Sequence, residues 1–374
     1  MAVKCPSMTT KRNRRIVIWA MSLSLLLGLV GTPGFIPSVD AASSSASARI
    51  IKKLKQQVAA LKKQVSALTQ QLAIARQPAP FVEMVTVGDP GNPTGEASVY
   101  GQFGAVATTF RIGKFEVTNA QYAAFLNAVA GDDTFSLFND AMGNDGFGFG
   151  GGIARFGSSP NFKYAPRTAM ADKPVNYVTW FDAARFCNWL HNGRPTGVQD
   201  ANTTETGAYT LNGAMSGVGI ARETGAKFWL PNADEWHKAA YYQPASQGGD
   251  TDSYWLYPTG SNAAPSVATA NAIGEITNDS ANLANHASGA VWNGITGHAT
   301  SVGSGGSGTS SHYGAFDMGG NVKEWTDHVD ATFRFLLGGA SVDSETKMRA
   351  SERDRFTPIN AFQEAGFRVA GSVE

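Results

Sequence analysis

The pattern of the chain changes at Pro78 and Pro80, and this change constrains the fold more than any other feature. Before the two prolines, apolar residues recur every three or four positions, whereas after them only short segments keep a helical or strand pattern. A long helix needs a sustained period of about 3.6 residues, and proline ends it. The sequence therefore predicts a helical stem followed by a larger, loop-rich domain.

The stem has the spacing of a coiled coil. Its apolar positions are Ile51, Leu54, Val58, Leu61, Val65, Leu68 and Leu72. β-Branched residues at the first core position with leucine at the second favour a parallel two-stranded coil. Lysines and glutamines flank this seam, so no ion pairs select the partner. We expect residues 50–77 to self-associate in an order that the sequence leaves open; the alternative is a single amphipathic helix.

The N-terminus resembles a secretory signal. A basic cluster at residues 11–15 precedes the apolar run from Ile16 to Val30, and residues 39–41 form a cleavage site with small residues. The run is shorter than the roughly 20 residues that a membrane span needs. We expect a signal peptide over 1–41, a tether over 42–49 and export to the periplasm, cell surface or medium. An uncleaved anchor is the alternative.

Composition excludes some classes of protein. The formal net charge of zero gives no electrostatic argument for a nucleic-acid or acidic-lipid partner. Removal of the signal would leave Cys187 as the single cysteine, so no internal disulfide is expected. The 42 glycines favour turns over long helices.

Beyond the prolines, short elements alternate with long connections. Strands are expected over residues 81–87 and 109–117, and helices are expected to begin after Thr118, at Trp180 and after Pro231. A loop rich in glycine and phenylalanine is expected over 143–157, and polar connections fill much of 243–311. Trp255 lies in these connections, where an aromatic side chain either stacks on a ligand or packs into the core.

Five motifs in this stretch occur in a recognisable order. They are Phe110–Phe125, Pro174–Trp189, Leu230–Trp236, Gly320–Trp325 and Gly366–Val369. Together they resemble the formylglycine-generating enzyme (sulfatase-modifying factor) family. The fourth motif matches the family's "GNVWEW" apart from Lys323. The resemblance implies an α+β, C-type-lectin-like fold with little regular secondary structure over residues 81–372.

The resemblance also implies an oxidase site, from which this chain departs. Oxidases of the family bind copper with two cysteines that follow a "GGS" element. Here the element is Gly338-Gly339-Ala340, and the two positions fall on or near Asp343 and Met348. Neither side chain supplies the thiolate that copper(I) prefers. We therefore expect no copper and assign no catalytic residue, and we expect Cys187 to be a packing residue.

Other oxidases of the superfamily use iron. The six histidines are His191, His237, His286, His298, His312 and His328. None shows a close spacing typical of metal ligands, although a site built from three distant histidines is left open.

Calcium is the cofactor that the resemblance does imply. In the family the "GNVWEW" loop binds it, and the corresponding groups are the side chains of Asp317, Asn321 and Glu324 with the carbonyls of Gly320 and Val322. Calcium prefers several oxygen ligands, including carbonyls of a turning backbone. The alternative is that these side chains only cap turns.

Two functions follow from these observations. The favoured one is an exported binding or scaffold module without oxidase activity, presented on an oligomeric stem, whose ligand is a peptide, a glycan or an envelope protein. The alternative is a metal-dependent, oxygen-using oxidoreductase with a rearranged site. The sequence leans against an enzyme because the thiol pair is missing.

Overall fold

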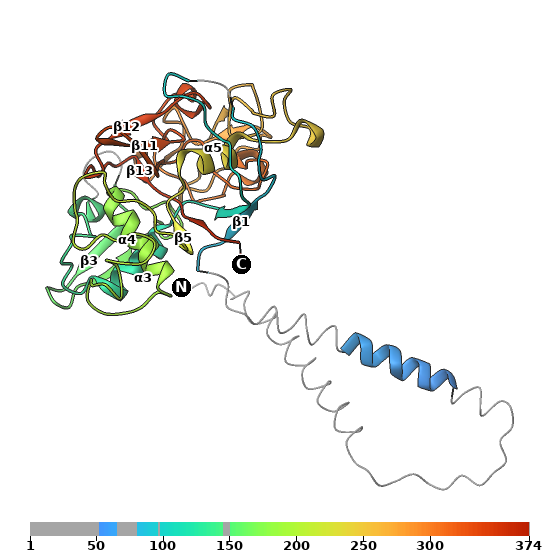
Figure 1. Cartoon of the computed structure of the whole chain (residues 1–374), viewed down its shortest axis with the longest axis horizontal. Helices are drawn as coiled ribbons and strands as arrows, with labels where there is room; N and C mark the ends of the chain where they lie inside the picture. The colour runs from blue at the N-terminus through green and yellow to red at the C-terminus, as the bar shows by residue number, and fades with distance from the viewer. Residues whose placement is uncertain (1–51, 66–80, 96–97, 145–149, 374) are drawn as a thin grey trace, which may run out of the picture. The chain divides into compact units, whose positions relative to one another are not determined.

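The computed structural model describes residues 52–65, 81–95, 98–144 and 150–373 (Figure 1). It divides into two units, Met1–Pro78 and Ala79–Glu374. The expected signal peptide and tether lie outside the described residues, as do residues 50–51 and 66–77 of the expected stem. Among the described helices, none is both long and apolar enough to cross a membrane.

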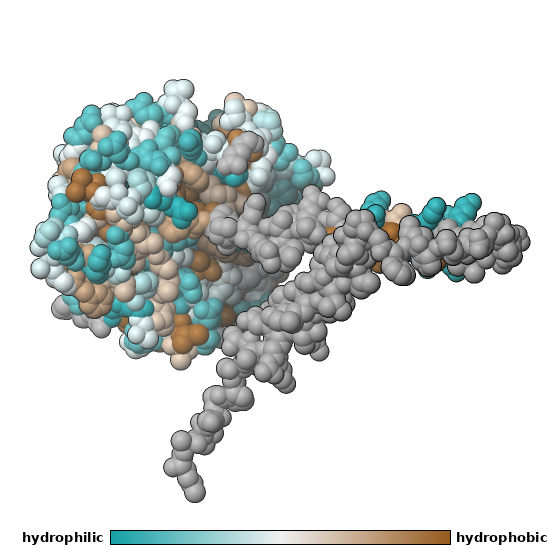
Figure 2. Space-filling model, turned by 90° about the horizontal axis from the view of Figure 1, so that it is seen from below, coloured by the Kyte–Doolittle hydropathy of each residue, from teal (hydrophilic) through white to brown (hydrophobic). Residues whose placement is uncertain are grey.

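Residues 52–65 of the stem form a helix. The apolar side chains of Leu54, Val58 and Leu61 are 53%, 49% and 54% exposed. Figure 2 shows hydrophilic side chains beside apolar ones on this helix. The helix agrees with the heptad interpretation, and the self-association of the stem stays a prediction.

Three helices of the second unit begin at a capping box. They are α3 (Asn119–Val129), α4 (Trp180–His191) and α5 (Ala233–Tyr241). Thr118, Thr179 and Asn232 accept a hydrogen bond from the third helical residue, whose own side chain accepts one from the cap backbone. These reciprocal bonds satisfy backbone groups that a helix start leaves unpaired. All three predicted helices are therefore present where the sequence placed them.

The strands are short and form two four-stranded sheets. The first has the order β1-β2-β14-β5, all antiparallel, and the second has the order β12-β11-β10-β13, in which only β10 and β13 are parallel. The first contains β1 (Met84–Val87), β2 (Phe110–Gly113), β5 (Phe228–Trp229) and β14 (Ala370–Gly371). The second contains β10 (Lys323–Asp330), β11 (Phe333–Leu337), β12 (Asp354–Phe356) and β13 (Ala365–Gly366).

Three small strand pairs and four 3-10 turns complete the domain. The pairs are β3 (Ile153–Phe156) with β4 (Lys163–Pro166), β6 (Ser266–Val267) with β7 (Leu283–Ala284), and β8 (Val291–Trp292) with β9 (Ile295–Thr296). The turns are η1 (Asp140–Gly143), η2 (Ala245–Gln247), η3 (Gly306–Thr309) and η4 (Glu345–Met348). This is the mixed α and β architecture, poor in regular structure, that the sequence predicts.

The strand expected over 81–87 begins only at Met84. Two further predicted boundaries were wrong. The strand expected over 109–117 spans only Phe110–Gly113; the amide of Gly113 bonds to the carbonyl of Val369, and the amide of Lys114 bonds to the carbonyl of Glu83. The loop expected over 143–157 contains β3, whose partner β4 lies beyond it. Pairing between segments decides both boundaries, and local composition does not show it.

Aromatic side chains fill the core between the helices and sheets. Phe125, Phe186 and Trp189 lie with ring centroids 5.3–5.7 Å apart where α3 and α4 meet. Trp180 and Trp325 are buried, and the indole of Trp325 donates a 2.9 Å hydrogen bond to the Val178 carbonyl. Large aromatic rings bury much apolar area per residue, which a domain with so few regular elements needs.

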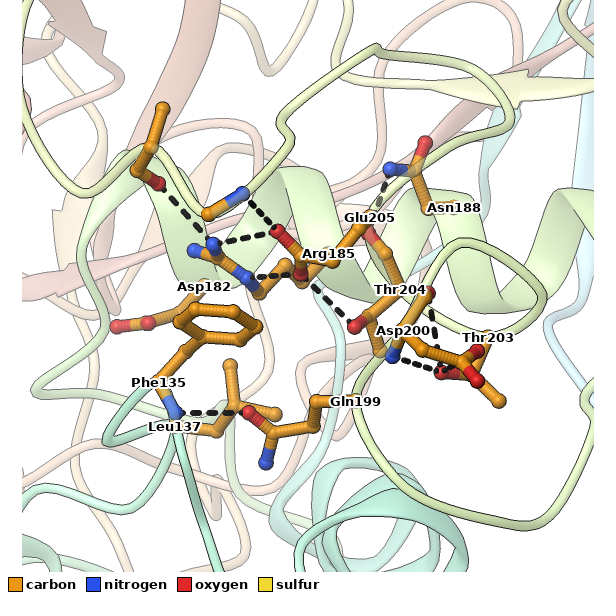
Figure 3. A network of polar contacts seen from close by, with 12 residues as sticks. Phe135, Leu137, Asp182, Arg185, Asn188, Gln199, Asp200, Thr203, Thr204 and Glu205 are labelled. Carbon is orange, nitrogen blue, oxygen red and sulfur yellow. Dashed lines mark hydrogen bonds and ion pairs between the residues drawn. The ribbon is translucent and has the colours of Figure 1, made fainter.

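A buried ion pair fixes the long connection that follows α4. Arg185 on α4 donates to both carboxylate oxygens of Glu205 at 2.7 and 3.0 Å, and to the carbonyl of Ala214 at 3.0 Å (Figure 3). The ring of Phe135 lies 4.3 Å from the guanidinium. Glu205 also accepts from the amide of Gly213. The pair therefore ties a segment without regular structure to the helix.

Removal of one partner tests this tie. We expect Glu205→Gln to destabilise the domain by about 3–5 kcal/mol, because it leaves the buried Arg185 charge uncompensated. Chemical denaturation measures the loss. The matched control is Glu223→Gln at an exposed glutamate, which should change the free energy of unfolding little. Equal stability of the two variants would contradict the assignment.

Candidate functional site

The loop that carries the fourth motif is packed against its neighbours through its backbone. Gly320 has φ +83°, and a Cβ there would lie 2.3 Å from the carbonyl oxygen of Asn285. Asn321 follows with φ +60°. Only glycine fits the first position without strain, so the turn brings residues 317–324 against the segment around Asn285.

Glu324 of this loop is paired with Arg368. The guanidinium donates to both carboxylate oxygens at 2.6 Å, and the indole of Trp236 adds a third bond at 2.7 Å. Arg368 and Glu324 are 0% and 1% exposed. Such a two-pronged, charge-assisted pair is strong in a dry site, and it uses both oxygens of the carboxylate.

The other predicted calcium residues also have protein partners. Asn321 accepts from the amide of Thr300 and donates to Glu116. Asp317 accepts from the amide of Gly303. No cluster of three or more His, Cys, Asp or Glu side chains among the described residues is arranged to hold a metal ion.

These residues do not fit a calcium cage in this arrangement. The guanidinium of Arg368 is hydrogen-bonded to both carboxylate oxygens of Glu324. A divalent cation bound to this carboxylate would therefore lie beside a positive charge. Calcium binding at Asp317, Gly320, Asn321, Val322 and Glu324 stays a prediction that the side-chain contacts do not support. All six histidines lie in the described residues, and no three of them form a group that could hold a metal ion. The three-histidine site that the sequence left open is therefore not formed in this structure.

Glu116 is a buried carboxyl beside this loop, and its pKa is shifted. It is 1% exposed, and its Oε2 has no hydrogen-bond partner. Burial raises the pKa of Glu116 well above its usual value, and the nearby Asp317 carboxylate raises it further. Arg368 acts in the opposite direction and lowers this pKa, but it is already paired with Glu324. Burial therefore favours the neutral form of the Glu116 carboxyl.

Asp343 and Met348, the residues on or near which the resemblance places the family's cysteines, lie in different environments. The carboxylate of Asp343 lies 3.1 Å from the ammonium of Lys323, and it also accepts from the amide of Ala340. Met348 is fully buried against Tyr257 and Ala284. One position thus belongs to an ion cluster and the other to a small apolar core.

Lys323 is the centre of that ion cluster. Its ammonium lies 3.1, 3.0 and 3.3 Å from carboxylates of Asp343, Asp354 and Glu364. Lys347 binds the other oxygen of Asp354 at 2.8 Å. Burial alone would lower the pKa of Lys323, but the three carboxylates outweigh it and raise the pKa above its ordinary value. The amine stays protonated, so it is neither a nucleophile nor a ligand for a metal.

Cys187 lies apart from this cluster, on α4. Its thiol is fully buried and free, and burial raises the pKa of that thiol well above its ordinary value. A thiol held neutral in an apolar core is unreactive. The structure thus gives Cys187 the packing role that its place on a predicted helix indicated.

A polar cavity is lined in part by Ala350 and Ser351, which lie in the sequence between Lys347 and Asp354 of the ion cluster. It has a volume of about 250 Å³. Its lining residues are His237, Asp250, Asp252, Tyr254, Trp255, Leu256, Asn262, Ala350 and Ser351. Tyr254 is buried, whereas Trp255 is half-buried, so the loop aromatics divide between core and cavity wall. This arrangement of one indole with carboxylate and amide groups can hold a polar ligand group.

Sequence reasoning missed the residues that matter most here. It identified Glu324 and Asp343 but not the pairing of Glu324 with Arg368 or of Asp343 with Lys323, nor the buried Glu116. One signal was available. Lys323 replaces the tryptophan of the family motif, so this chain has a cation where the motif has an apolar side chain, and a partly buried cation needs carboxylate partners.

The buried glutamate gives a prediction about pH. Because the folded-state pKa of Glu116 is raised above its ordinary value of 4.5, its contribution to stability is present at low pH and is lost as the pH rises. We expect the stability of Glu116→Gln relative to wild type to increase between pH 5 and 7, by up to about 1.4 kcal/mol per pH unit. Urea denaturation at several pH values measures this. Glu83→Gln, at an exposed ion pair, is the control, and a flat difference would contradict the prediction.

Comparison with known proteins agrees with the motifs. The family model of the sulfatase-modifying factor enzyme 1-like domain matches residues 80–373. A curated relative, "Chaperone protein LppX" of Paenibacillus barcinonensis, is 26% identical over 289 residues, which cover 74% of this chain and 84% of the relative.

Solved structures with related folds are more distant. The crystal structure of CarF is 19% identical with a TM-score of 0.46, and covers 78% of this chain and 99% of its own. Treponema denticola variable protein 1 is 18% identical with a TM-score of 0.43, and covers 78% and 95%. The match to the family model, over residues 80–373, spans well over half of the chain and is sufficient to show the family. The chain therefore belongs to the family of sulfatase-modifying factor enzyme 1-like domains.

Proposed function

We propose that this protein is an exported binding or scaffold module that uses the sulfatase-modifying-factor fold without its oxidase chemistry. The single observation that carries this proposal is the environment of the two cysteine positions. Asp343 belongs to the ion cluster of Lys323, and Met348 is buried. No thiolate is present there to bind copper or to activate a substrate thiol.

The ion cluster also argues against a rearranged soft-metal site. Lys323 is only 10% exposed at its side chain, and three carboxylates hold it as a cation. Placing a copper or iron ion beside this ammonium would add like charge to a partly buried site. The alternative, a metal-dependent oxidoreductase, therefore has no supporting donor set among the described residues.

The relative's name supports a polypeptide as the ligand. LppX is named a chaperone protein, and its similarity covers 84% of its own length. A chaperone binds another polypeptide, so of the three ligand classes that the sequence left open we favour an exported protein. The cavity beside Trp255 offers a place for one side chain of such a partner.

The stem supports presentation as an oligomer. The side chains of Leu54, Val58 and Leu61 are about half exposed on one face of the helix. Burying such a row against a second copy removes apolar area from water, at roughly 25 cal/mol per Å². We therefore propose that residues 50–77 pair in parallel and carry two copies of the domain.

The absence of oxidase chemistry is tested on the purified protein. We expect no conversion of a Cys-x-Pro-x-Arg peptide to formylglycine with copper and dioxygen, and no stoichiometric copper or iron by elemental analysis. A variant with cysteine at both positions, Asp343→Cys/Met348→Cys, shows by contrast whether two thiols restore copper binding. Turnover by the unmodified protein, or iron at one equivalent, would overturn the proposal.

Assembly through the stem is tested separately. Leu54→Lys/Leu61→Lys places charges in the seam, so we expect light scattering to give the mass of a monomer with a folded domain. The matched control, Gln56→Lys/Ala60→Lys, adds the same charge on the outer face and should leave the oligomer intact. An unchanged mass for the seam variant would contradict assembly through this helix.

A further inference from the structure

Charge is divided unequally between the stem and the domain. Residues 41–82 contain seven Lys and Arg and no Asp or Glu, whereas residues 83–374 contain 18 Lys and Arg against 29 Asp and Glu, a formal charge of −11. A net charge of zero for the whole chain conceals this division. Charge separation along a chain indicates a partner for the charged segment.

The described helix carries most of the basic charge. Its five lysines are Lys52, Lys53, Lys55, Lys62 and Lys63, and all are exposed. At about 100° of rotation per residue, the four lysines other than Lys53 fall within an arc of roughly 100° that begins beside the apolar seam. The glutamines at 57 and 64 flank the seam on the other side. The helix therefore has one basic face, defined here as Lys52, Lys55, Lys62 and Lys63.

Pairing of two stems leaves the charges of this face uncompensated. In a parallel pair the seam faces the partner helix, and Lys55 and Lys62 lie opposite the glutamines of the second copy. Because residues 41–82 contain no acidic residue, no ion pair forms between the stems. The basic faces of both copies stay available to an external anion.

We propose that the basic face binds the headgroups of an anionic lipid bilayer, an inference that rests on the proposed function for the pairing of the stem. The helix is about 20 Å long, and its lysines present a row of charges that suits an extended anionic surface. The same surface repels a domain of charge −11. Attraction of the stem and repulsion of the domain together make the stem, and not the domain, the part that contacts the lipid.

Binding of the exported protein, with its stem, to lipid vesicles tests the proposed lipid contact. We expect co-sedimentation with vesicles containing phosphatidylglycerol at low salt, little binding to phosphatidylcholine alone, and loss of binding as salt shortens the range of the attraction. Lys55→Gln/Lys62→Gln should weaken partitioning by roughly 25-fold, about fivefold for each lysine. The matched control, Lys163→Gln/Lys227→Gln, removes two exposed lysines from the domain and should leave partitioning unchanged.

Three results would overturn the inference. They are no binding to anionic vesicles at low salt, equal binding to neutral vesicles, and an equal loss in the two lysine variants. The first is expected if the acidic domain itself binds the stem. Light scattering without vesicles measures the mass of the oligomer and so tests the proposed assembly by itself. If the stem pairs but the protein does not bind lipid, only the lipid contact is disproved.

Discussion

One buried guanidinium holds the domain together. Arg368 binds Glu324 at the start of β10, the carbonyl of Gly113 at the end of β2 and the carbonyl of Phe316. Glu324 in turn binds the indole of Trp236 on α5. Both sheets and one helix therefore meet at a single ion pair. A charge with 0% exposure is tolerated there because each of the three guanidinium nitrogens donates a hydrogen bond and the Glu324 carboxylate balances the charge.

The long connections depend on the same principle on a smaller scale. Asn188 on α4 donates to the carbonyls of Thr204 and Tyr209 and accepts from the amide of Tyr209. Buried backbone groups outside helices and strands need such partners, since an unpaired group costs about 1–3 kcal/mol. Side-chain amides thus replace the hydrogen bonding that regular structure would provide. This explains how a domain with two-residue strands keeps a defined path.

This use of side-chain hydrogen bonds between loops also bears on function. A fold held by side-chain bonds between loops tolerates exchange of residues at one place, provided that the replacements satisfy each other. Lys323, Asp343 and Asp354 do so within 3.1 Å. They form an ion cluster that includes Asp343, a residue on or near which the resemblance places one of the family's cysteines. Such an exchange with the fold retained is what the proposed binding module requires.

Local signals fixed the parts of this protein that depend on neighbours in sequence. Thr118, Thr179 and Asn232 marked the starts of three helices, the motifs marked the family, and the heptad marked the stem, because caps and periodicities act within a few residues. Tertiary structure alone decided that Arg368 pairs with Glu324, that burial raises the pKa of Glu116, and that β3, inside an expected loop, pairs with β4 beyond it. Each of these depends on groups distant in the chain meeting in a dry interior, where one added charge or strand partner reverses the outcome, and no local pattern records that meeting.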